Sequence, residues 1–200
     1  MRYEKGQKEL TRSRILEVAS RRFRGEGVAG VGLAGIMQDA NLTNGAFYVH
    51  FKSKEDLVQE VVVDTLDRRL QAMVAAAEQG LGLEHGIREY LSTASRDAPD
   101  EGCPTAALVA EIARHPGETR DLFTHKIDEF LDFIARGLSG RDPVARRQDA
   151  AALFGLMVGT LQLARAVSDK AMSDQILEGG IKAGLAIVHR KQESPKQSRK

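Results

Sequence analysis

The chain has 200 residues, 42% of them hydrophobic and 28% charged, which suits one large or two small folded domains and excludes disorder of its bulk. A single cysteine excludes an intrachain disulfide framework, and the sequence has neither an apolar secretory segment nor an uncharged stretch of membrane-spanning length. Net charge is only +1, but residues 1–54 hold ten Lys and Arg against five Asp and Glu, and the remainder holds 19 against 23. We therefore expect a cytoplasmic protein whose positive charge is concentrated near its amino end.

Residues 1–8 are polar and basic without an apolar period, and we expect a flexible arm there. From Glu9 to Glu26 the apolar residues recur at helical spacing and predict an amphipathic helix, with Phe23 in its core. Gly25 and Gly27 are stop signals for this helix.

A second, short helix is predicted from the spacing of Leu33, Ile36 and Met37. A turn follows, in which Asn41 tolerates the left-handed conformation and Thr43 can cap the next helix by accepting a backbone N–H.

A third helix is predicted to begin at Asn44, burying Phe47 and Phe51 and leaving a polar face outside. Two helices joined by a tight turn, the second small and polar at its start, form the helix-turn-helix arrangement that enters the major groove of DNA.

These segments resemble the TetR/AcrR family of bacterial repressors. The resemblance covers about the first third of the chain and rests on Thr11–Leu16, Phe23, Gly27, Leu33–Ile36 and Leu42–Leu57. It implies an all-α protein with an N-terminal three-helix helix-turn-helix domain and a helical ligand-binding and dimerisation domain. It also implies a homodimer that binds a double-stranded DNA operator and is released by a small-molecule effector.

The resemblance implies a DNA surface on the third helix and its flanks. Small residues there let the backbone approach base edges, amide and hydroxyl groups contact bases and phosphates, and lysines neutralise phosphates. The implied residues are Gly32, Thr43, Asn44, Gly45, Ala46, Tyr48, His50, Lys52 and Lys54. Relatives usually carry Ser or Thr at the position of Gly32, so this residue either binds a phosphate through its N–H or is a plain cap. Relatives often carry Lys at the position of Asn44, so base preference can differ, and His50 is either a contact or a structural residue.

Ser53 with Glu55 and Asp56 predicts the start of a long helix, Lys54–Glu78, which the resemblance makes the mechanical link to the C-terminal body. Further helices are predicted at 84–98, 105–114, 117–138, 144–168 and 173–191. The resulting domains are an arm (1–8), a helix-turn-helix domain (9–56), an effector-binding and dimerisation domain (57–191) and a disordered tail (192–200).

The last two predicted helices carry small residues at close-packing intervals. Each glycine inside a helix costs roughly 1 kcal/mol relative to alanine, so we expect another helix backbone to come near. In the family these helices pair across a two-fold axis, and a self-packed monomer core is the alternative. The predicted interface residues are Ala151, Phe154, Gly155, Val158, Gly159, Ile181, Gly184, Leu185 and Val188.

The resemblance also implies an apolar effector cavity among the helices of residues 84–165. The candidate lining residues are Cys103, Leu108, Phe123, Ile127, Phe130, Met157 and Leu161. The alternative is a protein of the same fold that binds DNA without any small-molecule ligand.

The best candidate for a catalytic site is a thiol, an imidazole and a carboxylate that could form a nucleophile set: Cys103, His115 and Glu111. We expect no enzyme, since such a cysteine is commonly structural, and a redox or electrophile sensor through Cys103 remains an alternative. The histidines are scattered singly and no phosphate-binding glycine loop occurs, so no metal or cofactor is expected.

Overall fold

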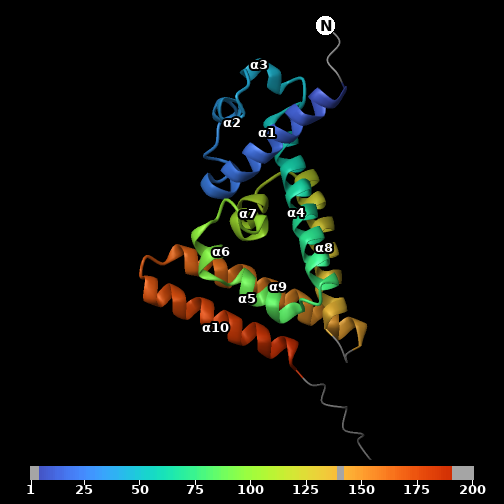
Figure 1. Ribbon diagram of the computed structural model, residues 1–200, viewed down its shortest axis with the longest axis vertical. Coiled ribbons are helices and arrows are strands. Elements are labelled where there is room, and N and C mark those ends of the chain that lie inside the picture. Colours follow the sequence, from blue (N-terminus) through green and yellow to red (C-terminus); the bar gives the residue numbers. More distant parts are fainter. Residues whose placement is uncertain (1–4, 139–141, 191–200) are drawn as a thin grey trace, which may run out of the picture. The chain divides into compact units, whose positions relative to one another are not determined.

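The computed structural model describes residues 5–138 and 142–190, and within these ranges all regular secondary structure is helical (Figure 1). The ten helices described are α1 (Lys5–Glu26), α2 (Leu33–Asp39), α3 (Asn44–Phe47), α4 (Lys54–Glu78), α5 (Leu83–Tyr90), α6 (Thr93–Asp97), α7 (Pro104–Ile112), α8 (Gly117–Gly137), α9 (Pro143–Ala166) and α10 (Lys170–Val188). The all-α fold class is confirmed.

Contacts between residues divide the chain into two compact units. The first contains the chain up to Ala72 together with Asp97–Lys126, and the second contains Met73–Arg96 together with the chain from Ile127 onward. This division differs from the predicted boundary between residues 56 and 57, because α4 is continuous there and α7 packs on α1 within the first unit. No local pattern in the sequence indicated that residues 97–126 pack with the N-terminal helices.

The first unit is built around α1, which contacts both α2 and α7. Its buried residues include four apolar side chains of α1, two of α2 and five of α4. They are Ile15, Leu16, Ala19, Phe23, Ile36, Met37, Leu57, Val58, Val61, Val62 and Leu66. This core holds the helix-turn-helix.

The start of α1 differs from the prediction. The helix begins at Lys5, and the Thr11 hydroxyl donates to the Gln7 carbonyl at 2.9 Å inside it. Lys, Gln and Glu are good helix formers, so the polar composition does not prevent a helix. The flexible arm is therefore wrong for Lys5–Lys8, while residues 1–4, like the predicted tail 192–200, lie outside the described residues.

The predicted bounds of α4 are confirmed, because both ends have capping interactions. At the start, the Asp56 N–H donates to Ser53 Oγ (3.1 Å) and the Lys52 N–H donates to Asp56 Oδ2 (2.8 Å), which is reciprocal capping. At the other end, Gly80 adopts a φ of +81° and the Leu81 N–H donates to the Ala76 carbonyl at 3.0 Å.

The second unit is organised by α9 and α10, which pack along each other, while α5 contacts both (Figure 1). Close approach depends on two glycines of α10. A Cβ at Gly180 would overlap the Thr160 side chain, and one at Gly184 would lie 3.2 Å from the Leu153 side chain. Asp142 and Asp169 cap the two helices by accepting backbone N–H groups of the first turns.

The single helix predicted at 84–98 is two helices, α5 and α6. Leu91 departs from helical geometry with ψ of +28°, and Ser92 Oγ then accepts the Ser95 N–H at 3.1 Å to begin α6. Ile87, Tyr90 and Leu91 share one buried face up to the break, and no Gly or Pro follows before Pro99, which is why the pattern predicted one helix. The other predicted helices differ from α7 to α10 only at their ends.

In the described part of the chain, no helix has the length and apolar character needed to cross a membrane. The same residues contain no cluster of three or more His, Cys, Asp or Glu side chains suited to a metal ion.

Candidate nucleic-acid interface

The turn between α2 and α3 is a Schellman motif. Asn41 adopts a φ of +56°, its N–H donates to the Gln38 carbonyl, and the Leu42 N–H donates to the Met37 carbonyl, both at 2.9 Å. Asn tolerates this left-handed conformation better than most residues, so the prediction for Asn41 is confirmed. The motif sets the direction in which α3 leaves α2.

Helix α3 is held in place by aromatic packing. Phe47 is 1% exposed and stacks on Phe51 with ring centroids 5.5 Å apart. The Arg12 guanidinium of α1 lies over the Phe51 ring, 5.2 Å from its centroid, and pairs with Glu60 of α4. These contacts join α3 and the following turn to both α1 and α4.

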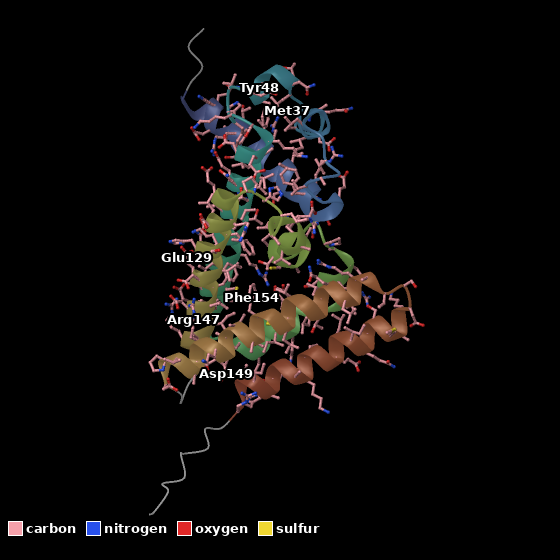
Figure 2. The ribbon with its side chains drawn as sticks, turned by 180° about the vertical axis from the view of Figure 1, so that it is seen from behind. Met37, Tyr48, Glu129, Arg147, Asp149 and Phe154 are labelled. Atoms are coloured by element: carbon pink, nitrogen blue, oxygen red, sulfur yellow. The ribbon has the colours of Figure 1, made fainter. Side chains whose placement is uncertain are left out.

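The opposite side of α3 and its turn faces solvent. Tyr48 is 69% exposed and Val49 is 61% exposed, although both are large apolar or aromatic side chains. Figure 2 shows where Tyr48 lies. Sequence reasoning assigned Tyr48 to the DNA surface but missed Val49, whose exposure follows from the helix ending at Phe47 and the chain turning there. An exposed methyl-bearing side chain next to a tyrosine suits contact with thymine methyl groups.

Most of the predicted DNA residues lie on this exposed side. Gly32, Thr43, Asn44, Gly45 and Lys52 are exposed, and Ala46 is half-buried. Gly32 and Thr43 are the N-caps of α2 and α3 with extended backbones, and neither provides a side-chain capping hydrogen bond. The predicted capping role of Thr43 is therefore wrong, and its hydroxyl has no partner within α3. A Cβ at Gly45 would meet no atom within 4 Å, so nothing inside the protein requires glycine there.

His50 lies differently from the other predicted contacts. It is half-buried, its ring is 6.4 Å from that of Phe51, and its Nδ1 is buried without a hydrogen-bond partner. Burial lowers the pKa of His50, and the nearby Lys8 and Arg12 lower it further. His50 is therefore less accessible than the exposed residues of the predicted DNA surface, and its contact with DNA stays a prediction.

Lys54 has a partner inside the protein. Its Nζ donates to the Val28 carbonyl at 2.6 Å, which fixes the loop between α1 and α2. Of the two lysines predicted to neutralise phosphates, this leaves Lys52 as the one whose side chain is exposed.

The same loop is held from its other side by α7. The Ala29 N–H donates to Glu111 Oε2 at 3.1 Å, and Gly27, with a φ of +80°, brings the chain against that carboxylate. A Cβ at Gly27 would lie 2.7 Å from Glu111 Oε1, so a larger residue would displace the contact. We call the hydrogen bonds of Lys54 and Glu111 to residues 28 and 29 the loop contacts; no sequence pattern indicated the role of Glu111.

The candidate enzyme residues are engaged elsewhere. His115 Nδ1 lies 3.0 Å from the Glu55 carboxylate, which also accepts a hydrogen bond from Thr119, and Glu111 takes part in the loop contacts. Burial raises the pKa of Glu55, but the hydrogen bonds from Thr119 and His115 outweigh it and the pKa lies below its usual range. Cys103 is 5% exposed at the N-cap of α7.

The seven predicted effector-pocket residues divide between the two units. Cys103, Leu108 and Phe123 belong to the first, whereas Ile127, Phe130, Met157 and Leu161 belong to the second. Five of the seven are buried, and Phe123 and Ile127 are half-buried. Their grouping into one cavity stays a prediction.

The predicted dimer residues also differ in exposure. Phe154, Val158 and Gly184 are buried within the second unit, where Phe154 lies 5.8 Å from the Phe130 ring (Figure 2). These three are largely covered by the protomer's own side chains, and their place in a dimer interface stays a prediction. Ala151, Gly155 and Gly159 are exposed on α9, and Ile181, Leu185 and Val188 are half-buried on α10.

The helices α2 and α3, joined by a tight turn and exposing small and polar residues, are typical of DNA-binding proteins of the helix-turn-helix class. Residues 15–61 match the profile of the family described as bacterial regulatory proteins, tetR family. Over 168 residues the chain is 38% identical to the HTH-type transcriptional regulator TtgR of Pseudomonas putida, covering 84% of this chain and 70% of that protein. The chain belongs to the TetR family and is a DNA-binding transcriptional regulator, not an enzyme.

Solved structures agree on the fold. A TetR-family regulator from Cytophaga hutchinsonii superimposes with a TM-score of 0.74 at 20% identity, covering 94% of this chain and all of that one. The regulator FadR of Bacillus subtilis, in complex with stearoyl-CoA, gives a TM-score of 0.64 at 16% identity, covering 88% of this chain and 97% of that one.

Replacing Glu111 by alanine tests the loop contacts. We expect faster amide hydrogen exchange over residues 27–31 and a loss of about 1 kcal/mol of unfolding free energy, because the Ala29 N–H loses its charged acceptor. Asp121→Ala on α8, an exposed carboxylate, is the control and should leave both quantities unchanged. Unaltered exchange in Glu111→Ala would show that the loop is fixed without this contact.

Proposed function

We propose that the protein is a homodimeric repressor, acting in the cytoplasm, whose two copies of α3 enter successive major grooves of a near-palindromic operator about 34–36 Å apart. The observation that carries the proposal is the exposed side of α3 and its turn, where Tyr48 and Val49 stand out from a buried aromatic support. Large side chains exposed on a rigid support suit an interface with a partner.

Each exposed group has a chemical role in this proposal. Gly45 and Ala46 let the helix approach the base edges, and the Asn44 amide offers both a donor and an acceptor to a base. Thr43 and Tyr48 supply hydroxyls to bases or phosphates, and the Gly32 N–H at the start of α2 can bind a phosphate. Lys52 supplies the mobile charge that makes binding depend on salt.

The double substitution Tyr48→Ala with Lys52→Ala tests operator binding. We expect affinity for the operator to fall by about a hundredfold or more and the salt dependence to fall by about one ion per protomer, because a base contact and a phosphate contact are both lost. Fluorescence anisotropy with the protein's own promoter fragment at several salt concentrations measures both effects.

The control for this experiment is Arg88→Ala, which removes one exposed charge of α5. It should bind like the unaltered protein. If the double variant binds the promoter fragment as tightly as the control does, α3 is not part of the DNA surface. If the unaltered protein binds the promoter fragment no more tightly than random competitor DNA, the operator proposal itself is rejected.

For the dimer we propose an exposed surface of α9 and α10, which we call the small-residue face. On α9 a Cβ at Gly155 or Gly159 would meet no atom within 4 Å, so the protomer itself does not need these glycines. Leu163, which follows Gly159 at i+4 on the same side of α9, is 54% exposed, and Met172 near the start of α10 is 52% exposed. Glycines that expose helix backbone next to apolar side chains suit the close approach of another helix.

Gly159→Arg tests this surface. We expect the 21.9 kDa chain to run as a dimer and the variant as a monomer in size-exclusion chromatography with light scattering, because a long charged side chain would block the approach. Gly86→Arg on α5 is the matched control, since a Cβ there also meets no atom within 4 Å. A dimeric Gly159→Arg would reject this surface, and a monomeric unaltered chain at micromolar concentration would reject the dimer.

We further propose that a small-molecule effector releases the operator. The fold can hold such a ligand, since FadR of Bacillus subtilis was solved with stearoyl-CoA. An effector that favours a conformation in which the two copies of α3 no longer fit the grooves lowers the affinity for the operator. By linkage, bound operator lowers the affinity for the effector by the same factor. The burial of Cys103 disfavours the alternative of a thiol sensor, because reactive cysteines are commonly accessible.

A thermal-shift screen of apolar and drug-like compounds tests the effector. We expect at least one compound to raise the melting temperature and, at the same concentration, to release the operator, because it binds the folded chain in one conformation. Compounds that raise the melting temperature without changing operator affinity would contradict release, and the absence of any shift would favour a DNA-binding protein without a ligand.

A further inference from the structure

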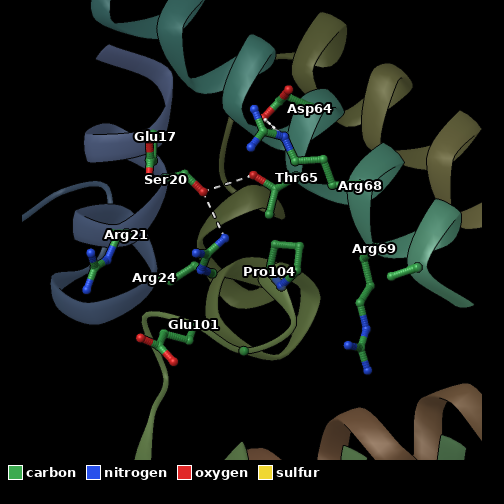
Figure 3. A pocket seen from close by; sticks show the side chains of 12 residues that line it. Glu17, Ser20, Arg21, Arg24, Asp64, Thr65, Arg68, Arg69, Glu101 and Pro104 are labelled. Atoms are coloured by element: carbon green, nitrogen blue, oxygen red, sulfur yellow. Dashed lines mark hydrogen bonds and ion pairs between the residues drawn. The ribbon is translucent and has the colours of Figure 1, made fainter. Parts of the chain in front are cut away.

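The first unit contains a cavity of about 430 Å³ that neither the DNA surface nor the predicted effector pocket uses (Figure 3). Its walls come from α1, α4 and the loop leading into α7. The lining residues that matter are Arg21 and Arg24 of α1, Arg68 and Arg69 of α4, and the hydroxyls of Ser20 and Thr65. The volume is in the range of small-molecule sites.

Arg24 is the central group of this cavity. Its Nη1 donates to Ser20 Oγ at 2.8 Å and its Nε donates to the Asp100 carbonyl at 2.6 Å, so both partners are neutral acceptors. Among the described residues, no carboxylate lies within ion-pair distance of this half-buried guanidinium. Burial lowers the pKa of Arg24, more than the neighbouring Asp100 raises it. The cation is thus held in place but not neutralised by an ion pair.

A chain of hydroxyl groups fixes the orientation of Arg24. Thr65 Oγ1 donates to the Val61 carbonyl at 2.6 Å, so its lone pairs accept from Ser20 Oγ at 3.0 Å. Ser20, which is buried, in turn accepts from Arg24 (Figure 3). A guanidinium that donates to two fixed acceptors has its remaining N–H groups preorganised, which favours bidentate binding of a planar or tetrahedral oxyanion.

The other arginines add charge from both sides. Arg21 pairs with Asp100 at 3.5 Å and Arg68 pairs with Asp64 at 3.0 Å, and both side chains are more than half exposed. Exposed pairs of this kind are weak, and each guanidinium keeps further donors for a ligand. The wall also carries the carboxylates of Glu17, Asp64 and Glu101, which would repel a polyanion.

We propose that this cavity binds a small anionic ligand, a carboxylate or a phosphate monoester, through Arg24 with Arg21 and Arg68. Such a ligand would give Arg24 a negatively charged partner and would contact both α1 and α4. None of these lining residues belongs to the proposed operator surface, so anion binding can be measured in the absence of DNA.

Isothermal titration calorimetry of the full chain with inorganic phosphate, and separately with succinate, tests the proposal against potassium chloride of equal ionic strength. We expect saturable binding of at least one anion. Tighter binding of phosphate would indicate a phosphorylated ligand, and tighter binding of succinate a carboxylate. Lack of saturable binding of either anion would overturn the proposal.

Variants assign the binding to this cavity. Arg21→Gln with Arg68→Gln leaves the hydroxyl chain and Arg24 intact, and it should weaken binding by about tenfold or more, as expected for the loss of charge-assisted hydrogen bonds. Arg24→Met should abolish binding, and circular dichroism would report whether it folds; if it does not, the double variant decides.

Arg88→Gln is the control, because it removes a guanidinium on α5, outside the cavity. It should bind the anion as the unaltered chain does. If the double variant also binds like this control, the anion binds elsewhere and the proposed site is wrong.

Discussion

The burial of Phe47 and Phe51 is the interaction that holds the proposed DNA surface, the exposed side of α3 and its turn, in place. Helix α3 has four residues, far fewer than the dozen or so that an isolated helix needs to be stable in water. Its position must therefore come from tertiary packing, and burying two phenylalanine side chains contributes roughly 1.5–3 kcal/mol each. Since Arg12 covers the second ring and pairs with Glu60, the same packing ties α3 to the helices before and after it.

Local signals in the sequence predicted the parts of the fold that local interactions determine. Asn41 and Ser53 mark a turn and a helix start because their backbone and side-chain preferences act within a few residues. The break at Leu91 was missed because no Gly or Pro marks it in the sequence between Leu91 and Pro99. The contacts of residues 97–126 with the N-terminal helices were not foreseen because the partners lie about 75 or more positions away in sequence, as in the contacts of Glu111 with residue 29 and of Arg24 with residue 100.

The candidate site shows the same division. Exposure of Asn44, Gly45 and Tyr48 followed from the helical period, since these residues occupy the face opposite the buried rings. The inward hydrogen bond of Lys54 and the buried Nδ1 of the half-buried His50 did not follow, because a lysine or histidine near a groove-binding helix has the same sequence pattern whether it faces DNA or the protein. Sequence gives the type of group, and packing decides where it points.

Helix α7 connects two features of the first unit. Pro104 at its start lines the arginine cavity, and Glu111 near its end takes part in the loop contacts beside α2. A ligand in the proposed anion site would contact α1 and α4, and α1 packs against both α2 and α7. If occupancy shifts α7 between two positions, it changes the support of the helix-turn-helix, and operator and anion would then influence each other's affinity by the same factor.

The small-residue face of α9 bears on the choice of partner. A surface of bare glycines supplies shape but few distinguishing side chains, so it cannot by itself reject a paralogue that shares the fold. Discrimination then falls to the side chains around it, such as Leu163 and Met172, whose bulk must fit the opposing subunit. In a cell with several such regulators, substitutions at Leu163 and Met172 would allow a subunit to pair with a paralogue. The resulting heterodimer would bind an operator that combines one half-site of each regulator.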